Sequence, residues 1–217
     1  MKSIRGISAV FVLAGILLNN WIVGIFINWH LFTSGGSVSE FSAANQPHSW
    51  LFRVLDVVAG LMILAGSIIL FRYARNHRFA RIISISGMIL GPANCLDALL
   101  PLPCSGTVNP DCSAPLHISL HRISLPDHAL SSVIIAACFL LMPLAGTALA
   151  RAHEFRIFHR LSIAAVFLMV LFLAVLTIES FWENRLTDHL VGLAQQLQML
   201  VFGVWFALLS WQIKKLD

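Results

Sequence analysis

Four side chains that could do chemistry together lie near positions 97 and 128. Asp97 stands in an apolar segment, and His128, Ser131 and Ser132 open the next one. The positive end of a helix dipole disfavours imidazolium, so a histidine at a helix start stays neutral and suits general-base work or metal ligation. A serine beside that histidine, with the aspartate orienting the ring, could form a nucleophilic pair. The structural alternative is that these helical serines bond their own backbone carbonyls.

A zinc site is the second chemistry that this part of the chain allows. His117 and His121 lie four residues apart, a spacing that can place both on one helical face. Zinc takes three or four ligands, and a bound water of lowered pKa could attack an ester or an amide, with Glu40 or a loop histidine assisting. The predicted ligands are Asp97, His128, His121 and His117. Loop histidines that simply face water are the alternative.

The elements that must carry these residues are membrane-spanning helices. The chain has 217 residues, of which 58% are hydrophobic and 11% charged, and its mean hydropathy is +0.84. Soluble domains carry about 25% charged residues, and each crossing of a membrane needs roughly 20 apolar ones. We therefore predict an all-α, six-helix transmembrane bundle that forms one domain. Its spans are expected at about 7–29, 51–73, 82–102, 128–150, 161–178 and 190–213.

The basic residues predict the orientation of this bundle. Of the 14 Lys and Arg residues, all but Arg53, Arg122 and Arg185 fall at the chain ends and short loops of one side. The positive-inside rule places both termini in the cytoplasm, in a bacterial inner membrane. The bases are spread over short loops rather than pooled, so the net charge of +4 does not indicate a nucleic-acid partner. Membrane lipids are the expected partners.

Polar residues of several predicted spans lie at a similar depth below the outer end. Asp56 and Asp97 each lie about five residues, roughly 7 Å, below that end. Carboxylates at such a depth usually face a bundle interior or a wet cavity, so we predict a polar cavity open to the outer face. Its further members are Asn28, His128, Ser131, Ser132, Thr177, Gln195 and Gln196. Two alternatives stay open. These groups could simply bond to one another between helices. Arg53, one turn from Asp56, could neutralise the Asp56 carboxylate in an ion pair.

The cysteines divide into two kinds. Cys104 and Cys112 bracket an outer loop that is rich in Gly and Pro. In an oxidising periplasm such a pair favours a disulfide, which would pin the loop over the predicted cavity. Cys95 and Cys138 lie within predicted spans, and we interpret them as small packing residues.

Four stretches of the chain carry a resemblance: SVSEFSAANQPHSW with the span after it, LDALLPLPCSGTVNPDC, DHALSSVIIAACFLL and GLAQQLQMLVFG. Together they resemble a bacterial six-helix inner-membrane family of unknown function, over nearly the whole chain. One branch of that family has a further histidine three residues before the equivalent of His128, where this chain has Leu125. More distantly, the layout is similar to the alkaline ceramidase and adiponectin-receptor superfamily. That similarity implies histidines, an aspartate and a serine around an intramembrane zinc that hydrolyses lipid amides.

The leading hypothesis is a metal-assisted hydrolase that acts on a lipid ester or amide. The alternatives are a protein that binds a lipid or small molecule without turnover, an accessory membrane subunit, and a small transporter. No internal repeat supports the transporter. No lysine lies in a predicted span, which excludes a retinal Schiff base, and no phosphate-binding loop or Rossmann signature occurs.

Overall fold

The structure is a computed structural model that describes residues 2–74, 76–109, 111–112, 127–181 and 185–213. Within these residues it contains helices and no strand. The helices are α1 Lys2–Leu17, α2 Trp21–Ile27, α3 Trp29–Thr33, α4 Val38–Phe41, α5 Ser49–Tyr73, α6 Arg78–Leu99, α7 Asp127–Ala152, α8 Arg156–Phe181 and α9 Arg185–Ile213.

Among the described residues, six segments are long and apolar enough to cross a membrane. They are Gly6–Ile27, Ser49–Tyr73, Arg78–Leu99, Leu130–Ala152, Arg156–Val175 and Leu190–Ile213. Large apolar side chains cover their outer surface, with Phe26, Phe167 and Val133 each more than 60% exposed. The predicted all-α, six-span membrane fold is therefore confirmed.

The spanning helices begin earlier than the hydropathy pattern predicts, as α6 and α8 illustrate. α6 begins at Arg78 and α8 at Arg156, whereas the predicted spans begin at 82 and 161. Arginine is a good helix former, and its long side chain can reach the polar boundary from inside a helix. The basic residues expected in loops therefore occupy first helical turns.

The first span is interrupted rather than continuous. The Asn19 side-chain amide donates to the carbonyl of Gly15, and the backbone tightens so that Asn19 N bonds Ile16 O and Asn20 N bonds Leu17 O. An asparagine that competes for backbone groups in this way favours a turn over a continuing helix. α1 therefore ends at Leu17, and α2 resumes the span at Trp21.

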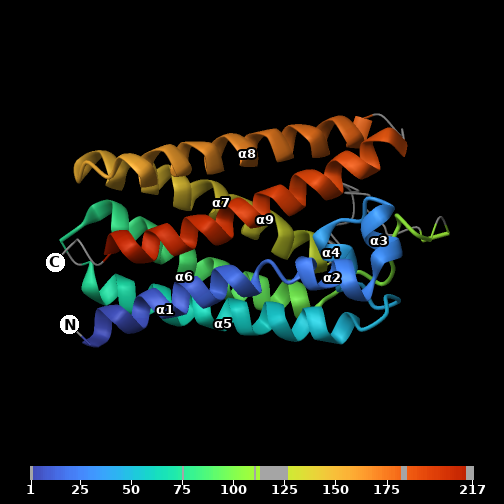
Figure 1. Cartoon of the computed structure of the whole chain (residues 1–217), viewed down its shortest axis with the longest axis horizontal. Helices are drawn as coiled ribbons and strands as arrows, with labels where there is room; N and C mark the ends of the chain where they lie inside the picture. Colours follow the sequence, from blue (N-terminus) through green and yellow to red (C-terminus); the bar gives the residue numbers. More distant parts are fainter. Residues whose placement is uncertain (1, 75, 110, 113–126, 182–184, 214–217) are drawn as a thin grey trace.

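The six spans form a closed ring. α5 packs on α6, α6 on α7, α7 on α8 and α8 on α9, while α1 lies between α9 and α5. The start of α1 and the end of α9 lie at the same end of the bundle, and the short helices α3 and α4 lie at the opposite end (Figure 1). This second end carries Glu40 and the end of α6, so it holds the predicted site.

Aromatic side chains fill the interior of the ring. The Phe139 ring of α7 lies 3.9 Å from the Phe202 ring of α9, measured between centroids, and Phe11 stacks on Phe206 at 5.6 Å. These four side chains are almost fully buried. The middle of the bundle is thus a packed, largely apolar core.

Glycines set the closest helix contacts. A Cβ on Gly91 of α6 would lie 2.6 Å from the carbonyl oxygen of Gly60 on α5, and a Cβ on Gly15 would lie 2.8 Å from that of Gly203. Small residues of this kind let membrane helices approach closely. The α5–α6 contact holds Asp56 and Asp97 on neighbouring helices.

Candidate functional site

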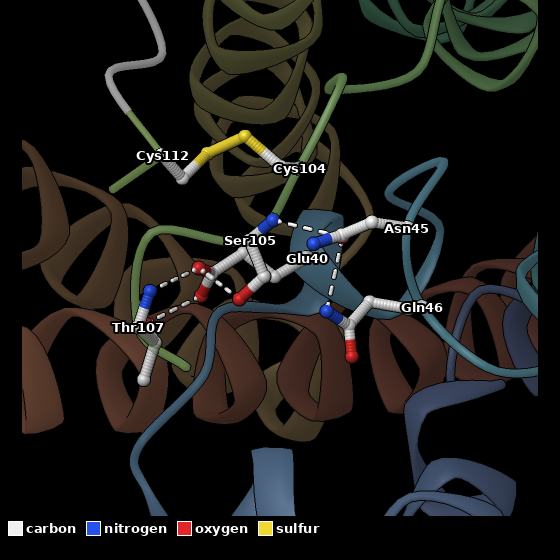
Figure 2. Close-up of a disulfide and its surroundings, with 7 residues drawn as sticks. All are labelled: Glu40, Asn45, Gln46, Cys104, Ser105, Thr107 and Cys112. Atoms are coloured by element: carbon white, nitrogen blue, oxygen red, sulfur yellow. Dashed lines mark hydrogen bonds between the residues drawn. A yellow bond between two sulfur atoms is a disulfide. The ribbon is translucent and has the colours of Figure 1, made fainter. Parts of the chain in front are cut away.

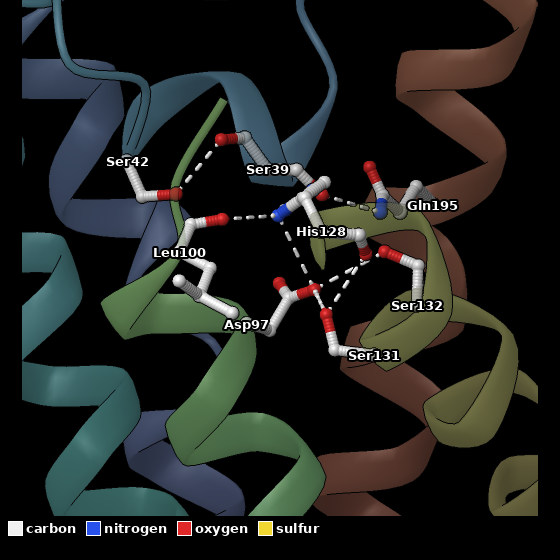
Figure 3. Close-up of polar contacts among 8 residues, drawn as sticks. All are labelled: Ser39, Ser42, Asp97, Leu100, His128, Ser131, Ser132 and Gln195. Atoms are coloured by element: carbon white, nitrogen blue, oxygen red, sulfur yellow. Dashed lines mark hydrogen bonds and ion pairs between the residues drawn. The ribbon is translucent and has the colours of Figure 1, made fainter. Parts of the chain in front are cut away.

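The structure brings together the four residues on which the sequence-based prediction centred. Ser131 Oγ donates to Asp97 Oδ1 at 2.7 Å, and Ser132 Oγ donates to the same oxygen at 3.1 Å (Figure 3). The Nδ1 atom of His128 lies 3.4 Å from that oxygen. Asp97 of α6 is thereby joined to the first turns of α7.

The orientation of the His128 ring follows from its second contact. Nδ1 also lies 3.1 Å from the backbone carbonyl oxygen of Leu100. A carbonyl oxygen can only accept a hydrogen bond, so Nδ1 carries the proton and donates it. In the neutral ring the lone pair then lies on Nε2. Among the described residues, nothing bonds Nε2, and the atom is not fully enclosed.

The end of α6 supplies that carbonyl. α6 ends at Leu99, and the backbone of Leu100 leaves the helical region with φ −115° and ψ 61°. Pro101 follows, which disfavours the helical region for the residue before it and lacks a backbone N–H to continue the helix. The last carbonyls of a helix have no partner within it. The Leu100 carbonyl, just beyond this end, is therefore available to His128.

The cluster remains partly accessible. The side chains of Asp97 and His128 are 20% and 13% exposed, whereas Ser131 is buried. Asp97 Oδ2 has no hydrogen-bond partner in the part of the chain that the structure describes. One carboxylate oxygen and one ring nitrogen are thus available to a further molecule.

The two serines hold the aspartate rather than the histidine ring. Ser131 Oγ lies 2.8 Å from the carbonyl of His128 as well as 2.7 Å from Asp97. A hydroxyl has one proton, so it serves these two acceptors in turn. No hydrogen bond between either hydroxyl and the His128 ring occurs within the described residues. The arrangement is an Asp–His pair braced by two serines, and a Ser–His pair is not formed.

Glu40 lies outside this cluster and has a structural environment of its own. Its Oε1 accepts from Ser105 Oγ at 2.7 Å and from the backbone N–H of Thr107 at 2.9 Å. Its Oε2 accepts from Thr107 Oγ1 at 2.8 Å (Figure 2) and from Ser37 N, also at 2.8 Å. The side chain is buried. With four donors around it, Glu40 fastens the loop after α6 to the start of α4.

The same loop contains the predicted disulfide, which the structure confirms. Cys104 and Cys112 are joined, with their Cα atoms 5.9 Å apart. Ser105 N donates to Asn45 Oδ1 at 3.0 Å, and Ala44 N donates to Leu102 O at 2.9 Å. The disulfide and these bonds to the segment before α5 hold the loop at the end of the bundle. Cys95 and Cys138 are free, and Cys138 is buried.

The remaining polar residues at this depth are paired separately. Asn20 Nδ2 donates to Asp56 Oδ1 at 2.6 Å, and Asn28 Nδ2 donates to Gln46 Oε1 at 2.8 Å. Gln195 bonds Val38 N and Ser39 Oγ, while Gln196 bonds the carbonyl of Gly36. These side chains connect elements instead of lining one site. The Thr177 side chain lies outside the described residues.

The histidine ligands of the predicted zinc site also lie in part outside the described residues, because His117 and His121 are not among them. Within the described chain, no group of three or more His, Cys, Asp or Glu residues is placed to hold a metal ion. Asp97 and His128 are the two predicted ligands that the structure places together.

Two contacts at this end of the bundle were missing from the sequence-based prediction. The contact of His128 with the Leu100 carbonyl involves a backbone atom, which every residue type has, so the residue type could not predict it. The bracing role of Glu40 did have a residue signal, because Ser37 and Glu40 form a capping box at the start of α4, and Ser-x-x-Glu is the sequence signature of that motif.

Comparison with known proteins identifies a family and no characterised relative. Residues 6–212 match the sequence model of a family described as "Protein of unknown function (DUF998)". This confirms the expected resemblance to a family of unknown function. No curated protein and no solved structure matches the chain.

Proposed function

We propose that this chain, which belongs to the DUF998 family, is a membrane hydrolase whose general base is His128. One observation carries the proposal: Nδ1 is held by the Leu100 carbonyl and the Asp97 carboxylate, which leaves the Nε2 lone pair available beside an aspartate. A positioned histidine of this kind contributes about 10²–10⁴-fold to a proton-transfer step.

In the proposed step, Nε2 of His128 takes a proton from a water molecule as the water oxygen attacks the carbonyl carbon of an ester or amide. The ring becomes an imidazolium, and the Asp97 carboxylate 3.4 Å from Nδ1 stabilises that charge. Ser131 and Ser132 hold Asp97 in place by donating to the same oxygen. The proton on Nε2 then passes to the leaving alcohol or amine, which restores the neutral ring.

The surroundings of the cluster support a lipid as the substrate. Leu96 and Leu99 flank Asp97 in α6 and are 50% and 66% exposed, while Leu130 and Val133 flank the two serines and are 48% and 64% exposed. Exposed apolar side chains on a membrane span face acyl chains. A molecule dissolved in the bilayer can therefore reach the cluster by moving along these four exposed apolar side chains.

Zinc is the cofactor proposed for an extended form of this site. The free Nε2 of His128 and Oδ2 of Asp97 are suitable donors, but zinc takes at least three protein ligands. His117 or His121 would have to supply the others. A bound zinc would lower the pKa of the attacking water, and His128, with Nε2 on the metal, would then be a ligand instead of the general base.

We also propose that the site faces the periplasm of a bacterial inner membrane, with both ends of the chain in the cytoplasm. The charge distribution supports this orientation, because the basic residues concentrate at the end opposite the cluster. The disulfide supports it too, since disulfides persist in oxidising compartments.

The test is hydrolysis of a total lipid extract by the purified full chain, with released fatty acids and truncated lipids followed by mass spectrometry. His128→Gln and Asp97→Asn should reduce the rate at least about 100-fold. His30→Gln is the matched control, because His30 is exposed in α3 and its ring lies outside the cluster. Each protein is assayed as purified and after zinc is supplied.

If wild-type protein releases no product with or without zinc, or if His128→Gln keeps the wild-type rate, the hydrolase proposal is wrong. A lipid that co-purifies unchanged with such an inactive protein would favour the binding protein instead. The Nε2 and Oδ2 atoms, which have no partner among the described residues, favour that second candidate, because they can hold a polar headgroup without reaction.

A further inference from the structure

Arg53 is a cation within a membrane span that has no counter-ion in the described chain. It lies in the second turn of α5 and is half-buried. Among the described residues its one hydrogen bond runs from Nη2 to Ser49 Oγ, at 3.3 Å. In that part of the chain its Nε is enclosed without a partner, and Nη1 has no partner but is not enclosed. A guanidinium in an apolar region is costly unless an anion accompanies it.

The carboxylate nearest to Arg53 along α5 does not form an ion pair with it. Asp56 lies one turn further along α5, at a spacing that permits an ion pair. Its carboxylate instead accepts a 2.6 Å hydrogen bond from Asn20, and no ion pair joins it to Arg53. The guanidinium is thus left available to a molecule from outside the chain.

Arg53 and Asp97 lie at the same depth on neighbouring helices. Asn94 of α6 donates to the backbone carbonyl of Asp56, and the sulfur of Cys95 lies 3.5 Å from the carbonyl of Val57. α5 and α6 run antiparallel, so Arg53 and Asp97 are each one turn, or about 5 Å, nearer to the same end. A lipid that reaches Asp97 from this side brings its headgroup to the level of Arg53.

The surrounding aromatic residues mark this level as the membrane boundary. Trp50 precedes Arg53 by one turn, Trp29 belongs to the same end of the bundle, and each is 60% exposed. Tryptophan is enriched at headgroup depth, where its ring meets both acyl chain and water. An anion at this position is therefore more readily a lipid headgroup than an ion from solution.

We propose that Arg53 binds the phosphate group of a membrane lipid, so that the lipid class recognised at this end of the bundle is a phospholipid. This rests on the proposed function only in calling that lipid a substrate. Arginine suits the task because its planar guanidinium donates two parallel hydrogen bonds to phosphate oxygens. Ser49, already bonded to Nη2, holds the side chain in place.

The experiment measures lipid binding to the detergent-purified full chain by native mass spectrometry. The probes are a short-chain phosphatidylglycerol, a diacylglycerol with the same chains, and inorganic phosphate. Arg53→Gln should weaken phosphatidylglycerol binding about tenfold, which is the loss of roughly one charge-assisted hydrogen bond. Diacylglycerol binding should not change. Arg53→Lys keeps the charge but loses the paired donors, so its affinity for phosphatidylglycerol should lie between those of the wild type and Arg53→Gln.

Arg72→Gln is the matched control, because it removes the same charge from the exposed opposite end of α5. It should leave the affinity for phosphatidylglycerol near that of the wild type. Inorganic phosphate should compete weakly if the acyl chains contribute to binding, whereas equal competition would identify a free-phosphate site instead.

Equal affinity of wild type and Arg53→Gln for phosphatidylglycerol, with the variant folded as judged by its unfolding temperature, overturns the phosphate site. So does equal loss in Arg72→Gln. These outcomes are independent of turnover. Binding that depends on Arg53, without hydrolysis, would contradict the proposed function and support the phosphate site. Hydrolysis that depends on His128, with binding that does not depend on Arg53, would support the proposed function and contradict the phosphate site.

Discussion

The side-chain amide of Asn20 donates a 2.6 Å hydrogen bond to the carboxylate of Asp56, which takes the place of an ion pair with Arg53. Asn20 itself is almost fully buried, at the turn that separates α1 from α2. The turn between α1 and α2 is therefore bonded to the second span. Because the Asn20 amide occupies the Asp56 carboxylate, the Arg53 guanidinium is left without that carboxylate.

Removing this amide should destabilise the fold. Asn20→Ala leaves the Asp56 carboxylate without its donor, a loss of about 1–3 kcal/mol in the free energy of unfolding. The measurement is denaturant unfolding in detergent, with Asn76→Ala in an exposed turn as the control. If the two variants unfold alike, or if Asn20→Ala and Asp56→Ala are strictly additive in a double-mutant cycle, the bond contributes nothing.

The protonation of His128 is open to direct measurement. In the neutral ring, Nδ1 should carry the proton, because it faces the Leu100 carbonyl and Asp97. Nitrogen-15 NMR of labelled histidine distinguishes the two tautomers by their chemical shifts. Assignment comes from the signal lost in His128→Gln. A neutral ring protonated at Nε2 would contradict the orientation on which the general-base mechanism depends.

The bond network of Glu40 should control the loop after α6. Glu40→Gln keeps the size but removes the charge and replaces one carboxylate oxygen by an NH2 donor, so that either Ser37 N or Thr107 N loses its acceptor. Amide hydrogen exchange around residues 105–108 should become at least about tenfold faster. Glu154→Gln, an equal change at an exposed site of the opposite end, should leave that exchange unaltered. Unchanged protection in Glu40→Gln would show that the disulfide alone holds the loop.

The close approach of α5 and α6 predicts a sharp difference between two glycines. A methyl group on Gly91 would meet the Gly60 carbonyl at 2.6 Å, so Gly91→Ala should cost about 1–3 kcal/mol of stability. Gly6→Ala should cost nothing, since a Cβ there has no neighbour within 4 Å. The comparison uses unfolding temperatures in one detergent. Equal unfolding temperatures for Gly91→Ala and Gly6→Ala would mean that α5 and α6 can move apart at little cost to accommodate the methyl group.

The proposed orientation can be tested with reporters at the end of α9. A green fluorescent protein fused there should fluoresce, and an alkaline phosphatase fused there should be inactive, because both report the compartment they reach. A phosphatase fused in the loop at Gly106, which has open space around it, should be active. The reverse pattern would place the site in the cytoplasm.

Hydropathy was sufficient to predict the architecture. Long apolar runs have few stable solutions in a membrane, so six spanning helices followed directly. The pairing of Cys104 with Cys112 followed from the Gly- and Pro-rich outer loop that they bracket. Asp97, His128 and the two serines could be grouped because a helix end and a helix start adjoin a single loop. Depth alone could not show which polar residues meet. Gln195 and Glu40 lie near the same end as Asp97, yet they bond α4 and the disulfide loop.

Ring closure has a consequence for the order in which this chain can become stable. α1 leaves the ribosome before α9, yet Phe11 stacks on Phe206, and the Asn19 amide donates to the carbonyl of Met199 in α9. Until α9 has entered the bilayer, that amide lacks one of its acceptors, and Gly15 lacks its contact with Gly203. During synthesis α1 therefore depends on α5 for lateral support. A nascent chain stalled before α9 would present a polar face to lipid, which is the kind of signal that membrane quality-control proteases can act on.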